Sequence, residues 1–195
     1  MTESTAIKDI CVYASSSDAL DACYYDAARA FGALLGRRGG TLIFGGGCIG
    51  LMGEAARAAH AAGGRVVGVI PDRLRLPGVA YESADELIVT PDMRTRKATM
   101  EARADAFVAL PGGIGTLEEV LEVLVLKQLR YHAKPVVFLN VAGFYDHLLG
   151  FFDHQIEARF AKPTMRSLYH VADTPEAVFT TLDAYTPPTI EDKWF

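Results

Sequence analysis

Residues 106–119 read AFVALPGGIGTLEE, and this stretch carries the pattern that decides the fold. The apolar run at 106–110 predicts a buried strand. A proline and three glycines follow, which disfavour the interior of a helix or strand and favour a turn. Two glutamates then stand at the start of a helix predicted over residues 117–131. A strand, a glycine turn and a helix in this order are typical of α/β proteins.

The same alternation extends along the whole chain. Strands are predicted at residues 10–13, 41–44, 65–70, 86–89, 106–110 and 135–139. Helices are predicted at residues 20–38, 51–62, 93–104, 117–131, 144–159 and 175–184. The strands are continuously apolar, which is typical of strands covered on both faces. We therefore expect a doubly wound, Rossmann-like, mostly parallel sheet with helices on both faces.

Composition favours a single domain over residues 1–195, with tails at 1–8 and 187–195. The chain has 195 residues, half of them apolar, and a net charge of −5. This charge gives no general attraction to nucleic acid or to an anionic membrane. No apolar run is long enough to span a bilayer. Three cysteines without metal-like spacing or an export signal indicate reduced thiols and a cytoplasmic location.

Ligands of such sheets bind beyond the carboxyl ends of the strands, where three loops are unusual. In the second loop, Gly45, Gly47 and Gly50 satisfy the dinucleotide pattern G-x-G-x-x-G, and Asp72 lies about twenty residues further on. The loop follows the second strand rather than the first, which argues against a full NAD site. Contact with phosphate, ribose or base and a tight structural turn both remain open.

The third loop, residues 111–116, ends where a helix begins, and free N–H groups at a helix start favour an anion. The basic segment 94–97 reads RTRK and lies near the start of the preceding helix. Cations gain nothing from a helix N-terminus, so their placement indicates a bound counter-anion. A solvated basic face is the alternative.

Glu119 has two compatible interpretations. Thr116 and Glu119 form a capping box, with Thr116 as the N-cap. Glu119 also lies at the mouth of the glycine loop, where it could act as a general base or stabilise positive charge. Catalysis and capping are equally supported by the spacing. Glu118 and Glu122 are expected on a shared, more exposed face.

Other candidates carry weaker signals. The first loop contains Ser15, Ser16 and Ser17, which could contact phosphate or ribose or simply cap a helix with Asp18. His147 and His154 could share a helix face, but no third ligand is near them, so no metal site is expected.

Three motifs resemble the Lonely guy (LOG) family of cytokinin-activating phosphoribohydrolases, many bacterial members of which were labelled lysine decarboxylases. They are GGGCIGLMGE at 45–54, MRTRK at 93–97 and PGGIGTLEE at 111–119. The similarity runs from CVYASSS at 11–17 to KPVVFLN and GFYDHLL at 134–149. Ala14 departs from the glycine of many members, which leaves the contacts of the first loop open.

The resemblance implies hydrolysis of the N-glycosidic bond of a purine nucleoside 5'-monophosphate. The substrates would be N6-prenyl-AMP, AMP (an AMP nucleosidase activity) or both, and no cofactor is implied. It implies Arg96 and Glu119 as the catalytic pair and a homodimer with the active site near the subunit boundary. The implied substrate-binding residues are Ser15, Gly46, Gly47, Met93, Lys97, Pro111, Gly112, Gly113, Ile114, Gly115 and Thr116.

Three alternatives remain from the residues. The first is a non-catalytic nucleotide- or cofactor-binding module, which would not need both Arg96 and Glu119. The second is an NAD-dependent oxidoreductase using residues 45–50. The third is a pyridoxal-phosphate decarboxylase with Lys97 as its Schiff-base lysine, for which the sequence shows no pyridinium partner.

Overall fold

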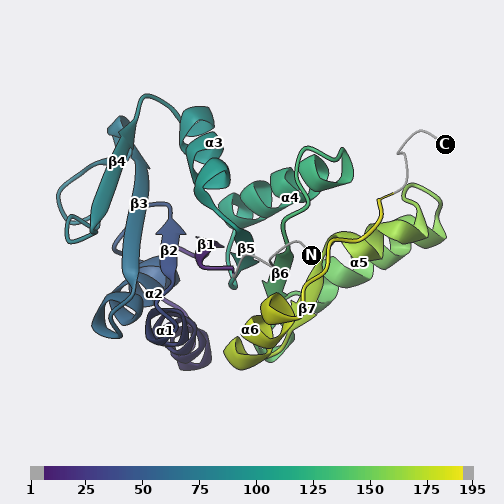
Figure 1. The fold of residues 1–195 in the computed structure, drawn as a ribbon, viewed down its shortest axis with the longest axis horizontal. Helices are drawn as coiled ribbons and strands as arrows, with labels where there is room; N and C mark the ends of the chain where they lie inside the picture. Colours follow the sequence, from purple (N-terminus) through teal and green to yellow (C-terminus); the bar gives the residue numbers. More distant parts are fainter. Residues whose placement is uncertain (1–6, 191–195) are drawn as a thin grey trace, which may run out of the picture.

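A computed structural model describes residues 7–190, which form a seven-stranded, wholly parallel sheet (Figure 1). The strand order is β4-β3-β2-β1-β5-β6-β7. The strands are β1 (Asp9–Tyr13), β2 (Thr41–Phe44), β3 (Arg65–Pro71), β4 (Glu86–Thr90), β5 (Ala106–Ala109), β6 (Val136–Leu139) and β7 (His170–Ala172). The predicted tails fall partly at residues 1–6 and 191–195, which lie outside the described residues.

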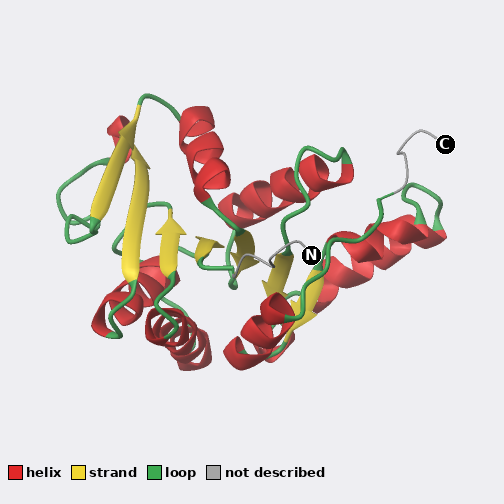
Figure 2. Ribbon diagram, viewed as in Figure 1, coloured by secondary structure: helices red, strands yellow, loops and turns green. Residues whose placement is uncertain are grey.

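Helices cover both faces of the sheet (Figure 2). The α-helices are α1 (Ala22–Arg37), α2 (Gly50–Ala61), α3 (Met93–Arg103), α4 (Ile114–Gln128), α5 (Asp146–Glu157) and α6 (Pro175–Asp183). Side chains of α1, α2 and α6 share one apolar cluster, and those of α3, α4 and α5 share the other. Short 3-10 segments occur at Asp72–Leu74, Val141–Gly143 and Pro163–Leu168.

The continuously apolar strands are explained by this two-sided cover. In β5, Phe107 belongs to the cluster beneath α3, α4 and α5, whereas the next residue, Val108, belongs to the opposite cluster. Both side chains are fully buried. Because successive side chains of a strand point to opposite faces, a strand between two helical layers is apolar at every position.

The predicted doubly wound α/β fold is confirmed, although some of its elements differ from the prediction. Strand β7 was not predicted, and α4 begins at Ile114 rather than at Leu117. Among the described residues, no helix has the length and apolar character required to cross a membrane.

The chain reverses its direction of winding at β1, which pairs with β2 on one side and β5 on the other. Ligands of open parallel sheets bind at such a switch point, beyond the carboxyl ends of the strands. Here the loops after β1 and β5 meet, since the Ser15 amide donates to the Pro111 carbonyl over 3.1 Å. The topology therefore places the predicted loops at the position where a site is expected.

Candidate active site

A buried ion pair joins the two helices that follow β4 and β5. Arg96 Nη1 of α3 donates to Glu119 Oε1 of α4 over 2.6 Å. The two side chains are 9% and 11% exposed. A buried pair of this kind needs good geometry and further hydrogen bonds to offset the loss of hydration. The two residues that the motifs single out thus converge on one place.

Three structural elements surround the guanidinium of Arg96. Its Nε donates to the Val69 carbonyl of β3 over 3.1 Å, while Nη1 bonds Glu119. Nη2 lies against Gly45, where an added Cβ would come within 2.0 Å of it. The absence of a side chain at residue 45 is therefore a requirement of the arginine's position and not merely of a tight turn.

Glu119 lies in an environment that opposes its ionisation. Burial raises the pKa of Glu119, and the charge and hydrogen bond of Arg96 lower it without fully offsetting the burial. A carboxylate held partly against its charged form is a better proton acceptor near neutral pH than an exposed one.

The start of α4 corrects the predicted capping box. Gly113 is the N-cap, and no side chain caps the helix, so Thr116 lies inside the first turn and is 4% exposed. Glu119 bonds Arg96 instead of the backbone of a capping residue. The prediction that Glu119 caps the helix together with Thr116 is thus wrong, and the buried partner of Glu119 is the cation of Arg96.

The glycines of the third loop differ in what constrains them. A Cβ on Gly112 would lie 2.1 Å from Thr116 Oγ1, so the packing of the helix start excludes a side chain there. A Cβ on Gly113 or Gly115 would meet nothing within 4 Å. Ile114, between them, is 86% exposed. The helix start at residues 113–115 is therefore open to a ligand.

Two of the three cations in the basic segment, Arg96 and Lys97, pair with carboxylates of α4. Lys97 Nζ pairs with Glu118 Oε1 and, over 2.6 Å, with Glu122 Oε2. Arg96 pairs with Glu119. The predicted need for a bound anion at these cations is therefore met by α4. The start of α3, which carries these cations, is capped by Asp92, whose side chain accepts from the Thr95 amide over 2.8 Å.

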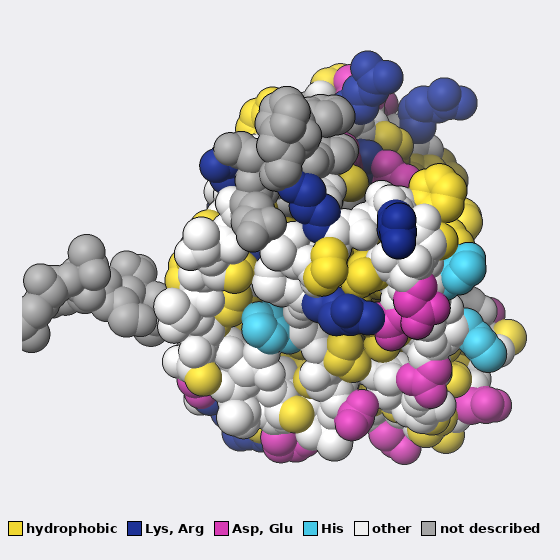
Figure 3. Space-filling view, turned by 90° about the vertical axis from the view of Figure 1, so that its right-hand side faces the viewer, with side chains coloured by type: hydrophobic (Ala, Val, Ile, Leu, Met, Phe, Trp, Pro, Cys, Tyr) yellow, Lys and Arg dark blue, Asp and Glu magenta, His cyan; other side chains and the backbone are white. Residues whose placement is uncertain are grey.

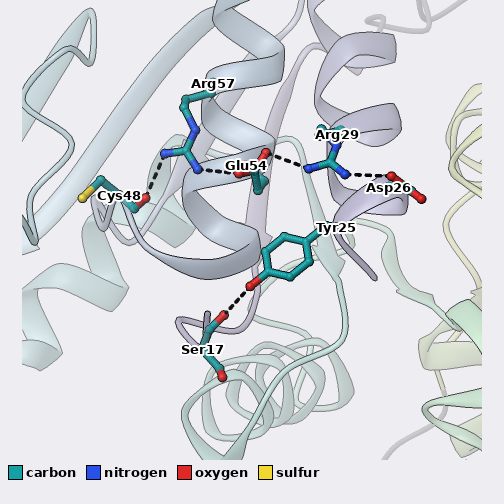
Figure 4. Close-up of polar contacts among 7 residues, drawn as sticks. All are labelled: Ser17, Tyr25, Asp26, Arg29, Cys48, Glu54 and Arg57. Carbon is teal, nitrogen blue, oxygen red and sulfur yellow. Dashed lines mark hydrogen bonds and ion pairs between the residues drawn. The ribbon is translucent and has the colours of Figure 1, made fainter. Parts of the chain in front are cut away.

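The second loop, residues 45–50, is largely covered by the segment before β4. Gly46 and Gly47 are buried. The Gly46 carbonyl accepts from the Tyr81 amide, and the Cys48 amide donates to the Val79 carbonyl. Arg57 of α2 donates to the Cys48 carbonyl and pairs with Glu54 (Figure 4). These bonds hold the loop in place and thereby fix the position of Gly45, against which the guanidinium of Arg96 lies.

A cavity of about 270 Å³ opens beside the third loop at the switch point. Ser15, Pro111, Gly112 and Gly113 line it together with three residues that sequence reasoning missed, namely Leu20, Tyr24 and Phe144. The rings of Tyr24 and Phe144 pack edge to face, with their centroids 5.8 Å apart. The signal for Phe144 lay in the motif GFYDHLL, which was noted without a role for this ring.

A larger cavity, of about 620 Å³, lies at the opposite edge of the sheet. Lys8, Gly40, Asp105 and Pro135 line it, and they immediately precede β1, β2, β5 and β6. Because ligands of this fold bind at the carboxyl ends of the strands, the smaller cavity is the better candidate.

Fold and site together define a class: Rossmann-like α/β proteins with a cavity at the switch point and a buried Arg–Glu pair between the helices that follow β4 and β5. The model of the family described as "Possible lysine decarboxylase" matches residues 52–182. The chain is 44% identical over 180 residues to cytokinin riboside 5'-monophosphate phosphoribohydrolase LOG5 of Arabidopsis thaliana, covering 92% of this chain and 79% of the relative. The probable phosphoribohydrolase LOG6 of the same plant is 45% identical over 185 residues, covering 95% and 92%. The chain belongs to this family of phosphoribohydrolases, the LOG family.

Solved structures with the same fold include proteins that carry a cofactor. The molybdenum cofactor binding protein of Rippkaea orientalis superposes with a TM-score of 0.69 at 23% identity, over 93% of this chain and 98% of that one. The Moco carrier protein of Chlamydomonas reinhardtii gives 0.67 at 26% identity, over 93% and 100%. These likenesses support the fold.

Proposed function

We propose that the protein hydrolyses the N-glycosidic bond of a purine nucleoside 5'-monophosphate, namely N6-prenyl-AMP, AMP or both, to the free base and ribose 5-phosphate. The single observation that carries this proposal is the buried contact between Arg96 and Glu119 beside the glycine loop. The names of the relatives LOG5 and LOG6 give the substrate class. The free thiols of Cys11, Cys23 and Cys48 support a cytoplasmic setting.

The pair suits the chemistry of glycosidic cleavage. Positive charge grows on the sugar as the bond to the base breaks. Glu119 stabilises that charge and orients the attacking water, for which its raised pKa also makes it a suitable base. Arg96 stabilises the departing, electron-rich purine but keeps its own proton, because a guanidinium does not lose its proton in this range, so the leaving nitrogen of the base takes its proton from water.

The open helix start binds the phosphate. The unpaired N–H groups at residues 113–116 and the positive end of the dipole of α4 favour a phosphate monoester. The apolar walls of the adjacent cavity, including Tyr24 and Phe144, suit a planar base or a prenyl group better than a charged one. Ser15 and Met93 are the proposed remaining contacts, and no metal or cofactor takes part in the proposal.

Chromatography of the products tests this function. Incubation with AMP and with isopentenyl-AMP should release adenine or isopentenyladenine together with ribose 5-phosphate. Adenosine should react roughly 10²- to 10⁴-fold more slowly in kcat/KM, since two charge-assisted hydrogen bonds to phosphate would contribute about 1.5–3 kcal/mol each. Equal turnover of adenosine and AMP would contradict phosphate binding at α4.

A non-catalytic cofactor carrier is the second candidate, and it is favoured by the fold likeness to the Moco carrier protein. A carrier needs the glycine loops but has no evident use for a buried Arg–Glu pair. A chain that binds nucleotides without releasing a base from any nucleoside monophosphate would favour this candidate.

We further propose that the protein is a homodimer joined through α4 and α5. Apolar side chains on this side of the molecule are exposed, and they are Leu121, Val125, Leu129, Phe151 and Phe160. Several of them line a groove of about 390 Å³ between the two helices. Hydrophobic groups also reach the surface among charged and histidine side chains on the face seen in Figure 3. Exposed apolar surface of this extent is typical of protein interfaces, and α4 would place Glu119 near the subunit boundary.

Sedimentation equilibrium tests the dimer. The wild-type protein should have twice the chain mass, and Val125→Asp should shift it to the monomer because the charge would be buried at the interface. Leu76→Asp is the matched control, since Leu76 is an exposed apolar residue, 54% exposed, outside α4 and α5. A monomeric wild type, or a dimer unaffected by Val125→Asp, would refute this interface.

A further inference from the structure

Lys97 stands next to Arg96 in α3, and its partners flank Glu119 in α4. Its ammonium is held between Glu118 and Glu122, and its side chain is only 12% exposed. We propose that Lys97 is a positioning residue that fixes α3 against α4 and thereby aligns Arg96 with Glu119, rather than a contact to the phosphate of the substrate. This inference rests on the proposed function.

The first argument is the weak apolar anchoring of α3. Only Arg96 and Met100 are buried along its 11 residues. Most helices of a globular protein are held by an apolar face. Polar contacts replace that face here, because Arg103 at the other end pairs with Glu86 of β4 over 2.6 Å. The position of α3 therefore depends on ion pairs to an unusual degree.

The second argument is the separate anchoring of the two helices. Helix α3 packs on β1, β2, β3 and β4, whereas α4 packs on β1, β5 and β6. The described cross-links between them are two neighbouring sets of ion pairs, Arg96 with Glu119 and Lys97 with Glu118 and Glu122. A second link one residue away limits how far the guanidinium can move relative to the carboxylate.

The third argument concerns the charge of Lys97. Burial acts to lower the pKa of Lys97, but the hydrogen bonds and the negative charges of Glu118 and Glu122 together outweigh burial and raise it. The lysine is thus a firmly charged bridge. A phosphate would have to compete with two carboxylates that are already in place.

Steady-state kinetics with AMP tests the proposal through the lysine and through its partners. Lys97→Met should lower kcat roughly 10- to 100-fold, as expected when a reacting group is displaced by about 1 Å, while KM changes less than about threefold. Lys97→Arg should restore most of the activity. The double variant Glu118→Gln/Glu122→Gln should lower kcat to a similar extent, since it breaks the same bridge from the other side.

The acid limb of the kcat/KM profile gives a readout that a loss of folding would not produce. Lys97 lowers and Glu118 raises the pKa of Glu119 through their charges. Lys97→Met should therefore move the acid limb to higher pH, and Glu118→Gln should move it to lower pH. Arg38→Met is the matched control: it removes an ion pair with Asp183 at the opposite edge of the sheet, outside α3 and α4, and should leave kcat within about twofold.

The outcomes separate this inference from the proposed function. A wild-type protein that releases no base overturns both. An active wild type overturns the inference alone if Lys97→Met raises KM with kcat intact. The inference is also overturned if the double variant Glu118→Gln/Glu122→Gln keeps full kcat. It is overturned as well if this variant binds AMP more tightly because the freed lysine contacts the phosphate.

Discussion

Glu119→Gln should reduce the release of adenine from AMP by roughly 10²- to 10⁴-fold while leaving nucleotide binding nearly unchanged. The amide has the size of the carboxylate but cannot accept a proton or balance positive charge on the sugar. The phosphate site proposed at the start of α4, where Gly113 is the N-cap, does not involve this side chain, so its contribution to affinity should remain. Single-turnover kinetics and calorimetric titration with AMP measure the two effects separately.

The fold should survive this substitution. Glutamine can still accept a hydrogen bond from Arg96, although the buried guanidinium loses its counter-charge. The thermal midpoint of the variant therefore serves as the control for correct folding. Wild-type turnover by a folded Glu119→Gln protein would refute the catalytic role of this residue.

Gly45→Ala should also cause a loss of activity of roughly 100-fold, through a residue that carries no functional group. The new Cβ would lie 2.0 Å from Arg96 Nη2, so the guanidinium must move. Movement breaks its bonds to Val69 and Glu119, which hold it in place. The strain should cost about 1–3 kcal/mol of unfolding free energy, because the displaced group is the end of a long side chain and not backbone.

The matched control is Gly150→Ala in α5, where a Cβ meets nothing within 4 Å. It should keep full activity, since an alanine in a helix interior is, if anything, stabilising. Kinetics and chemical denaturation of both variants separate the local displacement of Arg96 from a general effect of removing a glycine. If Gly45→Ala keeps its activity, the guanidinium does not need its observed position.

The sequence predicted most of the sheet because its signals are local. The apolar runs that became β1, β2, β3, β5 and β6 are continuous, and glycines or prolines mark several of their ends. Strand β7 escaped prediction because it has three residues, His170–Ala172, at the edge of the sheet. A short edge strand buries too little apolar surface to leave a pattern.

The site was predictable in its residues but not in its contacts. The start of α4 was placed too late because Thr116 and Glu119 match the spacing of a capping box. The structure uses both residues differently: Thr116 packs against Gly112, and Glu119 meets a cation from another helix. The partners of Lys97 could not be inferred, since they lie more than twenty residues away and depend on how α3 and α4 are placed on the sheet.

Because α3 and α4 are anchored on different halves of the sheet, activity is expected to require that both halves are folded. Neither half of the molecule holds both members of the proposed catalytic pair, since Arg96 belongs to one and Glu119 to the other. On the proposed mechanism, a chain that has unfolded on either side of β1 is therefore inactive, even where its remaining half is still native. Turnover is consequently a sensitive reporter of the whole domain's intactness, and partly denatured molecules add nothing to a measured rate.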